Sequence, residues 1–224
     1  MNKALTFVRL DCVTIKPYLT LKNLLILVGV SVIMSLNGNS VSTTIGLVML
    51  FGSLYVSYPF AVGEKRGIDA LYATLSITRG TVVLGRYLFS LLLNICAGIL
   101  SCVMVSVLSL ALKTTFDALE TILIVLVVLA ICSAIQAFQL PIYFKLGYSK
   151  AKFAAYLPFL IFPLAAFGLS SIPESSGAMN ALLHIPLWIN ENPVIFSVIC
   201  AALWLAIIMV SYRMSLAAYK KRDF

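Results

Sequence analysis

Apolar residues follow one another along this chain in long, nearly unbroken runs that end at polar or glycine-containing turns. A helix that crosses a bilayer needs roughly 20 apolar residues in a row, whereas a membrane β-strand alternates over roughly 10. The pattern therefore predicts an all-α integral membrane protein with six transmembrane helices. The six runs are Leu21–Leu36, about Ile45–Val62, Tyr87–Leu112, Leu119–Phe144, Phe153–Ile172 and Val194–Tyr212.

Composition agrees with the pattern. Of the 224 residues, 62% are hydrophobic and 11% are charged, whereas soluble domains are about half apolar and about a quarter charged. Six spans leave only short connections, so we expect residues 1–224 to form a single transmembrane domain without a separate soluble catalytic domain.

The basic residues fall almost entirely on one side of this arrangement. The net charge is +8, and all 16 Lys and Arg residues except Lys113 lie on the side that also holds both termini. Cytoplasmic loops carry the excess of Lys and Arg in membrane proteins. Both termini are therefore predicted to be cytoplasmic, with the basic loops facing anionic membrane lipid rather than nucleic acid.

Two shorter segments flank the spans. In residues 1–20, Leu5, Val8, Cys12, Ile15 and Leu19 share one helical face, while Phe7 falls off that face, which predicts an interfacial helix. A plain cytoplasmic anchor for the first span is the alternative. In residues 173–193, the apolar stretch 178–189 is too short to cross, so an external re-entrant element is expected.

The chemistry that would make this chain an enzyme is missing from the sequence. The middles of the six runs hold no Asp, Glu, Lys, Arg or His, and their polar residues include Asn94, Gln136 and Gln139. His184 is the single histidine, the five cysteines include no CxxC pair, and no GxxxxGK[ST] phosphate loop occurs. We therefore expect no catalytic residue, no metal and no cofactor in this chain.

The cytoplasmic segment 63–80, between the second and third runs, carries an amphipathic pattern. Its apolar positions follow helical spacing and its charged positions form a polar rim. The stripe is Ile68, Leu71, Tyr72 and Leu75, and the rim is Glu64, Lys65, Arg66 and Asp69. Such a helix either rests on the lipid surface or enters a groove on a soluble partner.

The segments Tyr58–Gly67 (YPFAVGEKRG), Leu75–Arg79 (LSITR) and Val83–Leu88 (VLGRYL) carry a family resemblance. Together they resemble the signature E-K-x-G … L-P-x-[ST]-R … V-x-G-[KR]-Y of bacterial ABC type-2 permeases. Ser76 stands where that signature usually has proline. The basic ending Tyr219–Phe224 is also similar to the tail of that group.

The resemblance implies a dimer of six-span subunits in the bacterial cytoplasmic membrane, with two copies of a separately encoded ATPase that binds ATP and magnesium. It implies that segment 63–80 is the coupling helix that docks into the ATPase, and that 178–189 matches an external re-entrant helix. A homodimer is expected over a heterodimer. Small members of the group are similar to exporters of phenol-soluble modulins, and others handle antibiotics or bacteriocins.

Aromatic residues in the second and fifth runs are candidates for a substrate path: Phe51, Tyr55, Phe159 and Phe162. We expect Pro59 to end the second span, and Pro158 and Pro163 to interrupt the fifth, so that an apolar cleft opens for hydrophobic or amphipathic cargo. The alternative is that the aromatic rings pack helices or face lipid. Two other functions also fit the sequence, a stand-alone channel or facilitator and a bacteriocin-immunity membrane protein.

Overall fold

The computed structural model describes residues 3–36, 41–65, 67–68, 77–113, 117–170 and 193–222, and this part of the chain is helical, without a strand. The helices are α1 (Lys3–Ile15), α2 (Leu21–Leu36), α3 (Val41–Leu54), α4 (Tyr58–Lys65), α6 (Arg79–Leu112), α7 (Ala118–Leu146), α8 (Tyr148–Ser170) and α10 (Pro193–Lys220). Short 3₁₀ turns, η1 (Lys16–Tyr18) and η2 (Tyr55–Ser57), join α1 to α2 and α3 to α4.

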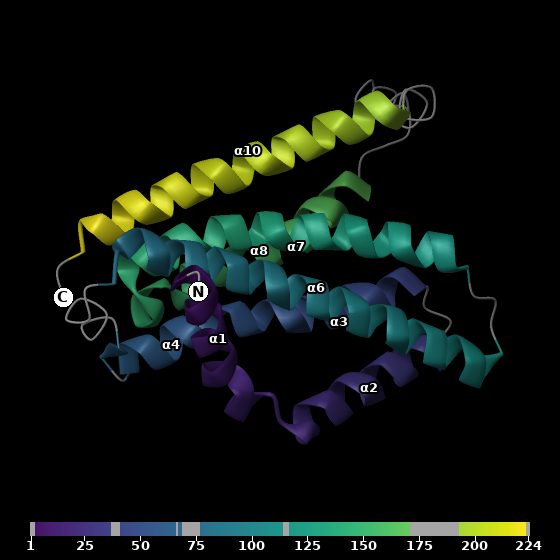
Figure 1. Ribbon diagram of the computed structural model, residues 1–224. Helices are drawn as coiled ribbons and strands as arrows, with labels where there is room; N and C mark the ends of the chain where they lie inside the picture. Colours follow the sequence, from purple (N-terminus) through teal and green to yellow (C-terminus); the bar gives the residue numbers. More distant parts are fainter. Residues whose placement is uncertain are drawn as a thin grey trace.

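The long helices lie side by side, and α6 occupies the middle of the assembly (Figure 1). It contacts α1, α2, α3, α7 and α10. The α1–α2 arm lies along one side of this bundle and α10 along another (Figure 1). The helix α6 therefore contacts both the α1–α2 arm and α10, and so connects the two sides of the molecule.

The described residues of all six predicted apolar runs lie on helices, which confirms the all-α membrane class. Among the described residues, four helical segments are long and apolar enough to cross a membrane: Ser42–Lys65, Arg79–Leu112, Ala118–Leu146 and Ser197–Lys220. The segments Leu5–Tyr18 and Leu21–Met34 pass the same test only as a pair, bent by 76°. The count of six spans stays a prediction.

The prolines do not break the helices as the sequence suggested. Helix α8 continues through Pro158 and Pro163, so the predicted interruption is wrong. Pro59 does not end the second span, because it lies in the first turn of α4, after the 3₁₀ turn η2. Proline is tolerated in the first turn of a helix because its missing N–H would have no partner there.

The N-terminal helix α1 packs against α6 at one end of the bundle (Figure 1). Its predicted apolar face is divided, because Val8 and Ile15 are buried against protein while Leu5 and Leu19 are exposed. Phe7, which falls off that face, is buried. The side of α1 that meets the bundle therefore includes part of the predicted apolar face together with Phe7, and the interfacial placement of the helix stays a prediction.

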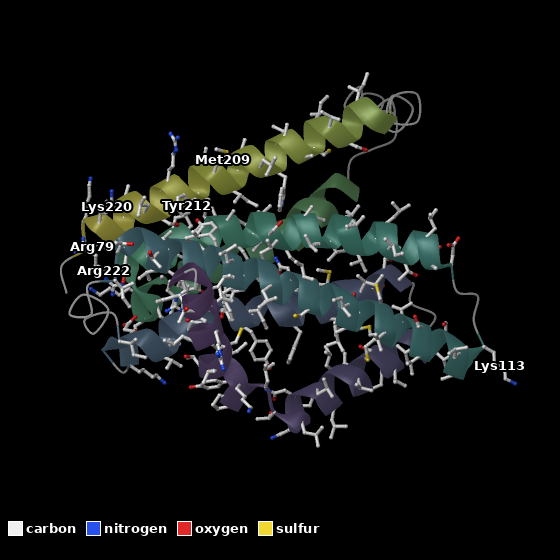
Figure 2. All side chains as sticks on the ribbon, viewed as in Figure 1. Arg79, Lys113, Met209, Tyr212, Lys220 and Arg222 are labelled. Atoms are coloured by element: carbon white, nitrogen blue, oxygen red, sulfur yellow. The ribbon has the colours of Figure 1, made fainter. Side chains whose placement is uncertain are left out.

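Basic side chains collect at the end of the bundle where α1 lies. Figure 2 shows Arg79, Lys220 and Arg222 at this end and Lys113 at the opposite end. We call the first of these the basic end. The distribution follows the charge asymmetry predicted from the sequence.

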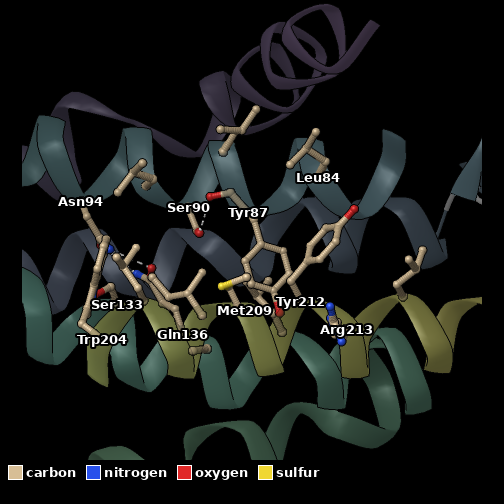
Figure 3. A pocket seen from close by; sticks show the side chains of 17 residues that line it. Leu84, Tyr87, Ser90, Asn94, Ser133, Gln136, Trp204, Met209, Tyr212 and Arg213 are labelled. Atoms are coloured by element: carbon tan, nitrogen blue, oxygen red, sulfur yellow. Dashed lines mark hydrogen bonds between the residues drawn. The ribbon is translucent and has the colours of Figure 1, made fainter. Parts of the chain in front are cut away.

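Helix α10 meets α7 and α6 without covering them completely. A groove with a volume of about 600 Å³ runs between the three helices (Figure 3). It extends along α10 from Trp204 to Leu216. We call this feature the α10 groove.

Candidate functional site

Five residues of the permease-like signature lie at the basic end, and between them they hold α1, α4, α8 and α10. We call these residues the signature cluster: Glu64, Arg79, Gly85, Arg86 and Tyr87. Four lie on the first turns of α6, and Glu64 lies on the last turn of α4. Their contact partners lie on α1, α4, α8 and α10.

Gly85 allows α1 to approach α6 closely. A Cβ atom at this position would lie 2.6 Å from Cδ1 and 3.0 Å from Cβ of Phe7, which is closer than carbon atoms pack. Phe7 is itself buried, with 4% of its surface exposed. The glycine of the signature is therefore required by the packing of the N-terminal helix.

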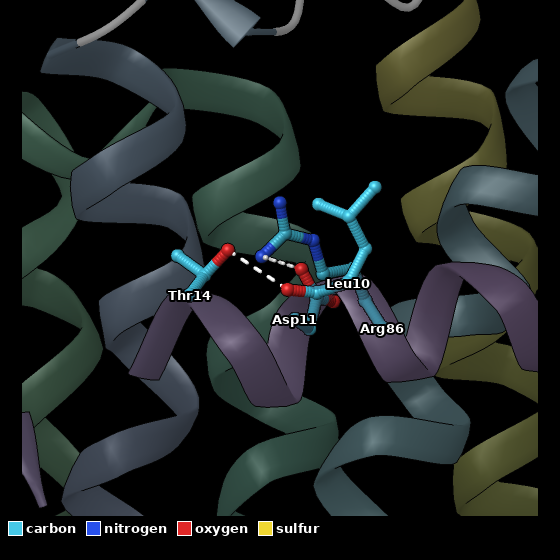
Figure 4. A network of polar contacts seen from close by, with 4 residues as sticks. All are labelled: Leu10, Asp11, Thr14 and Arg86. Carbon is cyan, nitrogen blue, oxygen red and sulfur yellow. Dashed lines mark hydrogen bonds and ion pairs between the residues drawn. The ribbon is translucent and has the colours of Figure 1, made fainter. Parts of the chain in front are cut away.

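Arg86 and Asp11 form a buried ion pair at the same crossing (Figure 4). Arg86 Nη1 lies 3.2 Å from Asp11 Oδ1, and the two side chains are only 4% and 2% exposed. The guanidinium also lies over two aromatic rings, 4.6 Å from the centroid of Phe60 and 5.6 Å from that of Phe7. Attraction between a cation and a ring face adds to the ionic contact. This arrangement fastens α1 to both α6 and α4.

Sequence reasoning did not select Asp11 as a site residue. It is a single carboxylate within an otherwise basic and apolar first segment, and 75 positions separate it from Arg86. An acidic residue that faces the apolar side of a helix is a signal for a buried partner, since an unpaired buried charge is strongly unfavourable. That signal could have been read, but the identity of the partner could not.

Tyr87 joins α6 to α10. Its hydroxyl shares hydrogen bonds with Ser211 Oγ and, at 2.8 Å, with Ser215 Oγ. Its ring meets Tyr212 edge to face, with the centroids 5.7 Å apart. Both serines are buried. The tyrosine of the signature therefore holds the basic end of α10 by hydrogen bonds and by ring packing.

Arg79 binds the end of the same helix. Its Nη1 donates to the carbonyl of Tyr219, at 3.2 Å, and to the carbonyl of Lys220. The last carbonyls of a helix lack partners within the helix and carry partial negative charge, so an arginine there satisfies both needs. Thr78 caps the start of α6 by accepting from the Thr81 backbone N–H at 3.3 Å.

Glu64 ties α4 to the connection between α7 and α8. Its Oε2 accepts from the backbone N–H of Ser149 at 3.1 Å. The intervening Gly147 adopts φ of +77°, and a Cβ there would lie 3.0 Å from both Glu64 Oε2 and Arg222 Nη2. A left-handed glycine without a side chain therefore lets a carboxylate and a guanidinium converge on the same turn.

The rim and stripe of the predicted coupling helix are described only in part. Ile68 packs against an apolar cluster that contains Phe7, Val83, Phe144 and Tyr219, as does Ile77 at the far end of the segment. Lys65 is exposed. The remaining predicted contact residues lie outside the described part of the chain: Arg66, Asp69, Leu71, Tyr72 and Leu75. Segment 178–189 lies outside it as well. The coupling helix stays a prediction, although both ends of its segment are anchored in the signature cluster.

Further along α6, neutral polar side chains replace charged ones. Asn94 and Gln136 exchange two hydrogen bonds of 2.8 Å each, and Gln136 Nε2 also donates to Ser53 Oγ at 3.1 Å. Gln139 Nε2 donates to the Ala155 carbonyl at 2.8 Å. These bonds connect α6, α7, α3 and α8. The three amides noted in the sequence therefore serve helix packing.

Two of the four predicted substrate-path residues lie together. Phe51 and Tyr55 meet with ring centroids 5.8 Å apart and line a cleft of about 630 Å³ between α1, α2, α3 and α6. The Tyr55 hydroxyl accepts from Asn23 Nδ2 at 3.3 Å and donates to the Tyr18 carbonyl at 3.4 Å. The side chains of Phe159 and Phe162 lie outside the described part. The prediction that the second and fifth runs together line a substrate path therefore stays a prediction.

No three His, Cys, Asp or Glu side chains come together in the part of the chain that the structure describes. The described cysteines are unbonded and scattered over four helices. Nothing in the described geometry therefore indicates a place for a metal ion.

Comparison with known protein families identifies the family of the chain and covers the signature cluster. The family model described as "ABC-2 family transporter protein" matches residues 7–220. The chain therefore belongs to the ABC-2 transporter family, as the resemblance in the signature segments predicted. None of the curated proteins matches the chain. The match begins at Phe7 and so includes Asp11 as well as the whole signature cluster.

Proposed function

We propose that this member of the ABC-2 family is the permease subunit of an exporter, powered by a separately encoded ATPase that binds ATP and magnesium. The observation that carries the proposal is the placement of the signature cluster. Glu64 and Arg79 of the cluster fasten the two ends of segment 63–80 to α8 and α10, and Ile68 and Ile77 pack the segment against α1, α6 and α7 at the basic end of the bundle. A partner that moves this segment would therefore move the helices that line the clefts.

The proposed transmission relies on rigid contacts near the segment. Ile68 and Ile77 pack on the same apolar cluster, so a force on the segment reaches Val82 and Val83 on α6 and Phe144 on α7. The ion pair between Asp11 and Arg86 extends that connection to α1. Packed interfaces tend to switch between discrete arrangements and do not deform continuously, which suits a subunit that alternates with each ATP cycle.

The proposed cargo is hydrophobic or amphipathic, and toxin or antimicrobial peptides are the class we favour. The cleft at Phe51 and Tyr55 is mainly apolar, and its described lining residues carry no charge. Its volume of about 630 Å³ is in the usual range for ligand sites, about 300–1,000 Å³. A site without charge offers little to a free ion or a sugar and suits an apolar side-chain surface.

We further propose a homodimer in the bacterial cytoplasmic membrane, with both termini and the basic end in the cytoplasm. The concentration of Arg79, Lys220 and Arg222 at that end supports this orientation (Figure 2). The partner ATPase would then approach segment 63–80 from the same side. In the proposed arrangement, ATP hydrolysis would take place outside the membrane and cargo movement within it.

Purification of the tagged protein from its native cells tests the proposal. We expect an ATP-hydrolysing subunit to co-purify, and its activity to rise when the permease is present. Leu71→Asp should abolish that capture, because a charge would replace an anchor at the centre of the contact, where single residues carry about 2 kcal/mol or more.

Lys65→Ala is the matched control, since exposed rim charges contribute about 0–1 kcal/mol, and it should leave capture unchanged. Full-strength capture of the ATPase by Leu71→Asp would contradict the docking model. ATP hydrolysis by the purified chain alone, or transport without any ATPase, would contradict the proposed function as a whole.

A further inference from the structure

The α10 groove shares no lining residue with the cleft at Phe51 and Tyr55, and Tyr87 is the one member of the signature cluster among its described lining residues. Apolar and aromatic side chains make up most of its walls, among them Leu84 on α6, Leu140 on α7 and Met209 on α10, and Figure 3 shows Leu84 and Met209 on facing helices. Two of these walls reach the outer surface, since Leu84 is 42% and Met209 is 61% exposed. In a membrane, such a groove opens toward lipid and is filled most favourably by a hydrocarbon chain.

The length of the groove matches one leaflet of a bilayer. Its lining on α10 runs from Trp204 to Leu216, which at 1.5 Å per residue is about 18 Å. Half of a typical hydrocarbon core is about 15 Å. An acyl chain that starts at the basic end would therefore extend along the groove as far as Trp204.

The end of the groove that lies nearest the basic end carries positive charge. Arg213 is the one charged residue among its described lining residues, and it lies toward the end that Tyr212 and Leu216 occupy. The same end of the molecule carries Arg79 and Lys220 (Figure 2). Basic pockets between membrane helices bind anionic lipid headgroups, and the planar guanidinium matches phosphate oxygens.

We propose that the α10 groove is a binding site for an anionic phospholipid of the leaflet at the basic end. One acyl chain lies between α6, α7 and α10, and the headgroup phosphate binds Arg213. The match to a single leaflet and the positive charge at this end of the groove favour this occupant over cargo or a second copy of the chain. The proposal stands or falls independently of the exporter function, since it needs no ATPase.

Trp204 supplies a reporter, because it lines the end of the groove that the methyl end of the chain would reach. The chain has two tryptophans, so Trp188→Phe leaves Trp204 as the only one. This full-length protein is reconstituted in phosphatidylcholine vesicles that contain a minor fraction of either phosphatidylglycerol or phosphatidylcholine brominated near the methyl end of its chains. Bromine quenches tryptophan fluorescence on contact.

We expect brominated phosphatidylglycerol to quench Trp204 about fivefold more effectively than brominated phosphatidylcholine at equal mole fraction, the factor that one basic group near an anionic leaflet contributes. High salt should reduce this preference by screening. Arg213→Gln should abolish the preference, and Arg213→Lys should keep most of it. Lys113→Gln, at the opposite end of the molecule, is the matched control and should leave the preference intact.

Three outcomes would overturn the proposal. Equal quenching by the two lipids would show an ordinary apolar surface without headgroup selection. Absence of quenching by either lipid would show that protein, such as a second copy of the chain, covers the groove. A preference for phosphatidylglycerol that survives Arg213→Gln would place the anionic site elsewhere. Where Arg213→Gln fails to fold, a preference for phosphatidylglycerol that high salt leaves unchanged would still overturn the proposal, because an ionic headgroup contact must be screened.

Discussion

Two buried polar contacts each hold α6 to a neighbouring helix, one through opposite charges and the other through neutral amides. At the basic end, Arg86 pairs with Asp11 of α1 through opposite charges. About 12 Å further along the helix, Asn94 pairs with Gln136 of α7 through two neutral amide hydrogen bonds. All four side chains are buried, and each pair holds α6 to one neighbour.

The difference follows from depth. An ionised side chain is expensive in the middle of a bilayer, whereas near the headgroups it gains from water and lipid charge nearby. Amides satisfy one another without any charge, so the middle of the protein stays neutral. Under the proposed function, the charged contact lies in the region that the ATPase would approach, and the neutral contact lies deeper in the bundle.

The largest predicted effect breaks the charged contact. Arg86→Met leaves the Asp11 carboxylate buried without its cation, and removal of one member of a buried pair typically destabilises by about 3–5 kcal/mol. The free energy of unfolding in mixed micelles with increasing denaturing detergent would measure the loss. The double variant Asp11→Leu with Arg86→Met should recover most of it, because no lone charge remains. A double variant as unstable as Arg86→Met would contradict this account.

The second effect tests the close approach beside that pair. Gly85→Ala places a methyl group 2.6 Å from Phe7 Cδ1, and overpacking of this kind costs about 1–3 kcal/mol. Phe7→Ala in the same chain should relieve the clash and show a positive coupling energy in a double-mutant cycle. Gly46→Ala is the matched control, since no atom lies within 4 Å of its added Cβ, and it should be neutral or slightly stabilising.

The third effect breaks the neutral contact. Asn94→Leu removes two hydrogen bonds, but the Gln136 amide keeps Ser53 as a partner. Polar contacts between membrane helices contribute about 0.6 kcal/mol on average and up to about 1.7 kcal/mol, so we expect a loss near 1 kcal/mol by the same unfolding measurement. A loss as large as that of Arg86→Met would mean that charge is not what distinguishes the two contacts.

Much of the fold could be predicted from hydrophobic patterning. Each apolar run lies on a helix because a bilayer demands continuous apolar length and internal hydrogen bonds. The start of α6 was missed by eight residues: the run begins at Tyr87, but the helix begins at Arg79, capped by Thr78. Polar first turns are invisible to a hydrophobicity criterion when they lie outside the membrane core.

The site could be predicted less well, because its contacts join distant segments. Helical spacing predicted the apolar stripe that begins at Ile68, and the family resemblance singled out the segments that contain Arg79, Gly85 and Arg86. Neither could show that Gly85 faces Phe7 or that Arg86 faces Asp11, since both contacts depend on how α1 crosses α6. The prediction that Pro158 interrupts the fifth run was wrong, because a proline within a long helix need not end it when neighbouring helices support the backbone.

The smallest predicted effect concerns the contact between α6 and α10. Tyr87→Phe removes a hydroxyl shared with Ser211 and Ser215, yet the ring keeps its packing against Tyr212. Ser211 retains the Ala137 carbonyl as an acceptor. A hydrogen bond contributes about 0.5–1.5 kcal/mol net, so we expect a loss at the lower limit of that range.

Ser215→Ala and the double variant complete a cycle that isolates the hydroxyl pair, and the unfolding free energies should show a coupling below about 1 kcal/mol. A value comparable to that of Asp11 and Arg86 would contradict the idea that charge concentrates stability at the α1 crossing. Such a value would instead mean that α10 is attached to α6 as firmly as α1 is. A movement of segment 63–80 would then be transmitted to α1 and α10 alike.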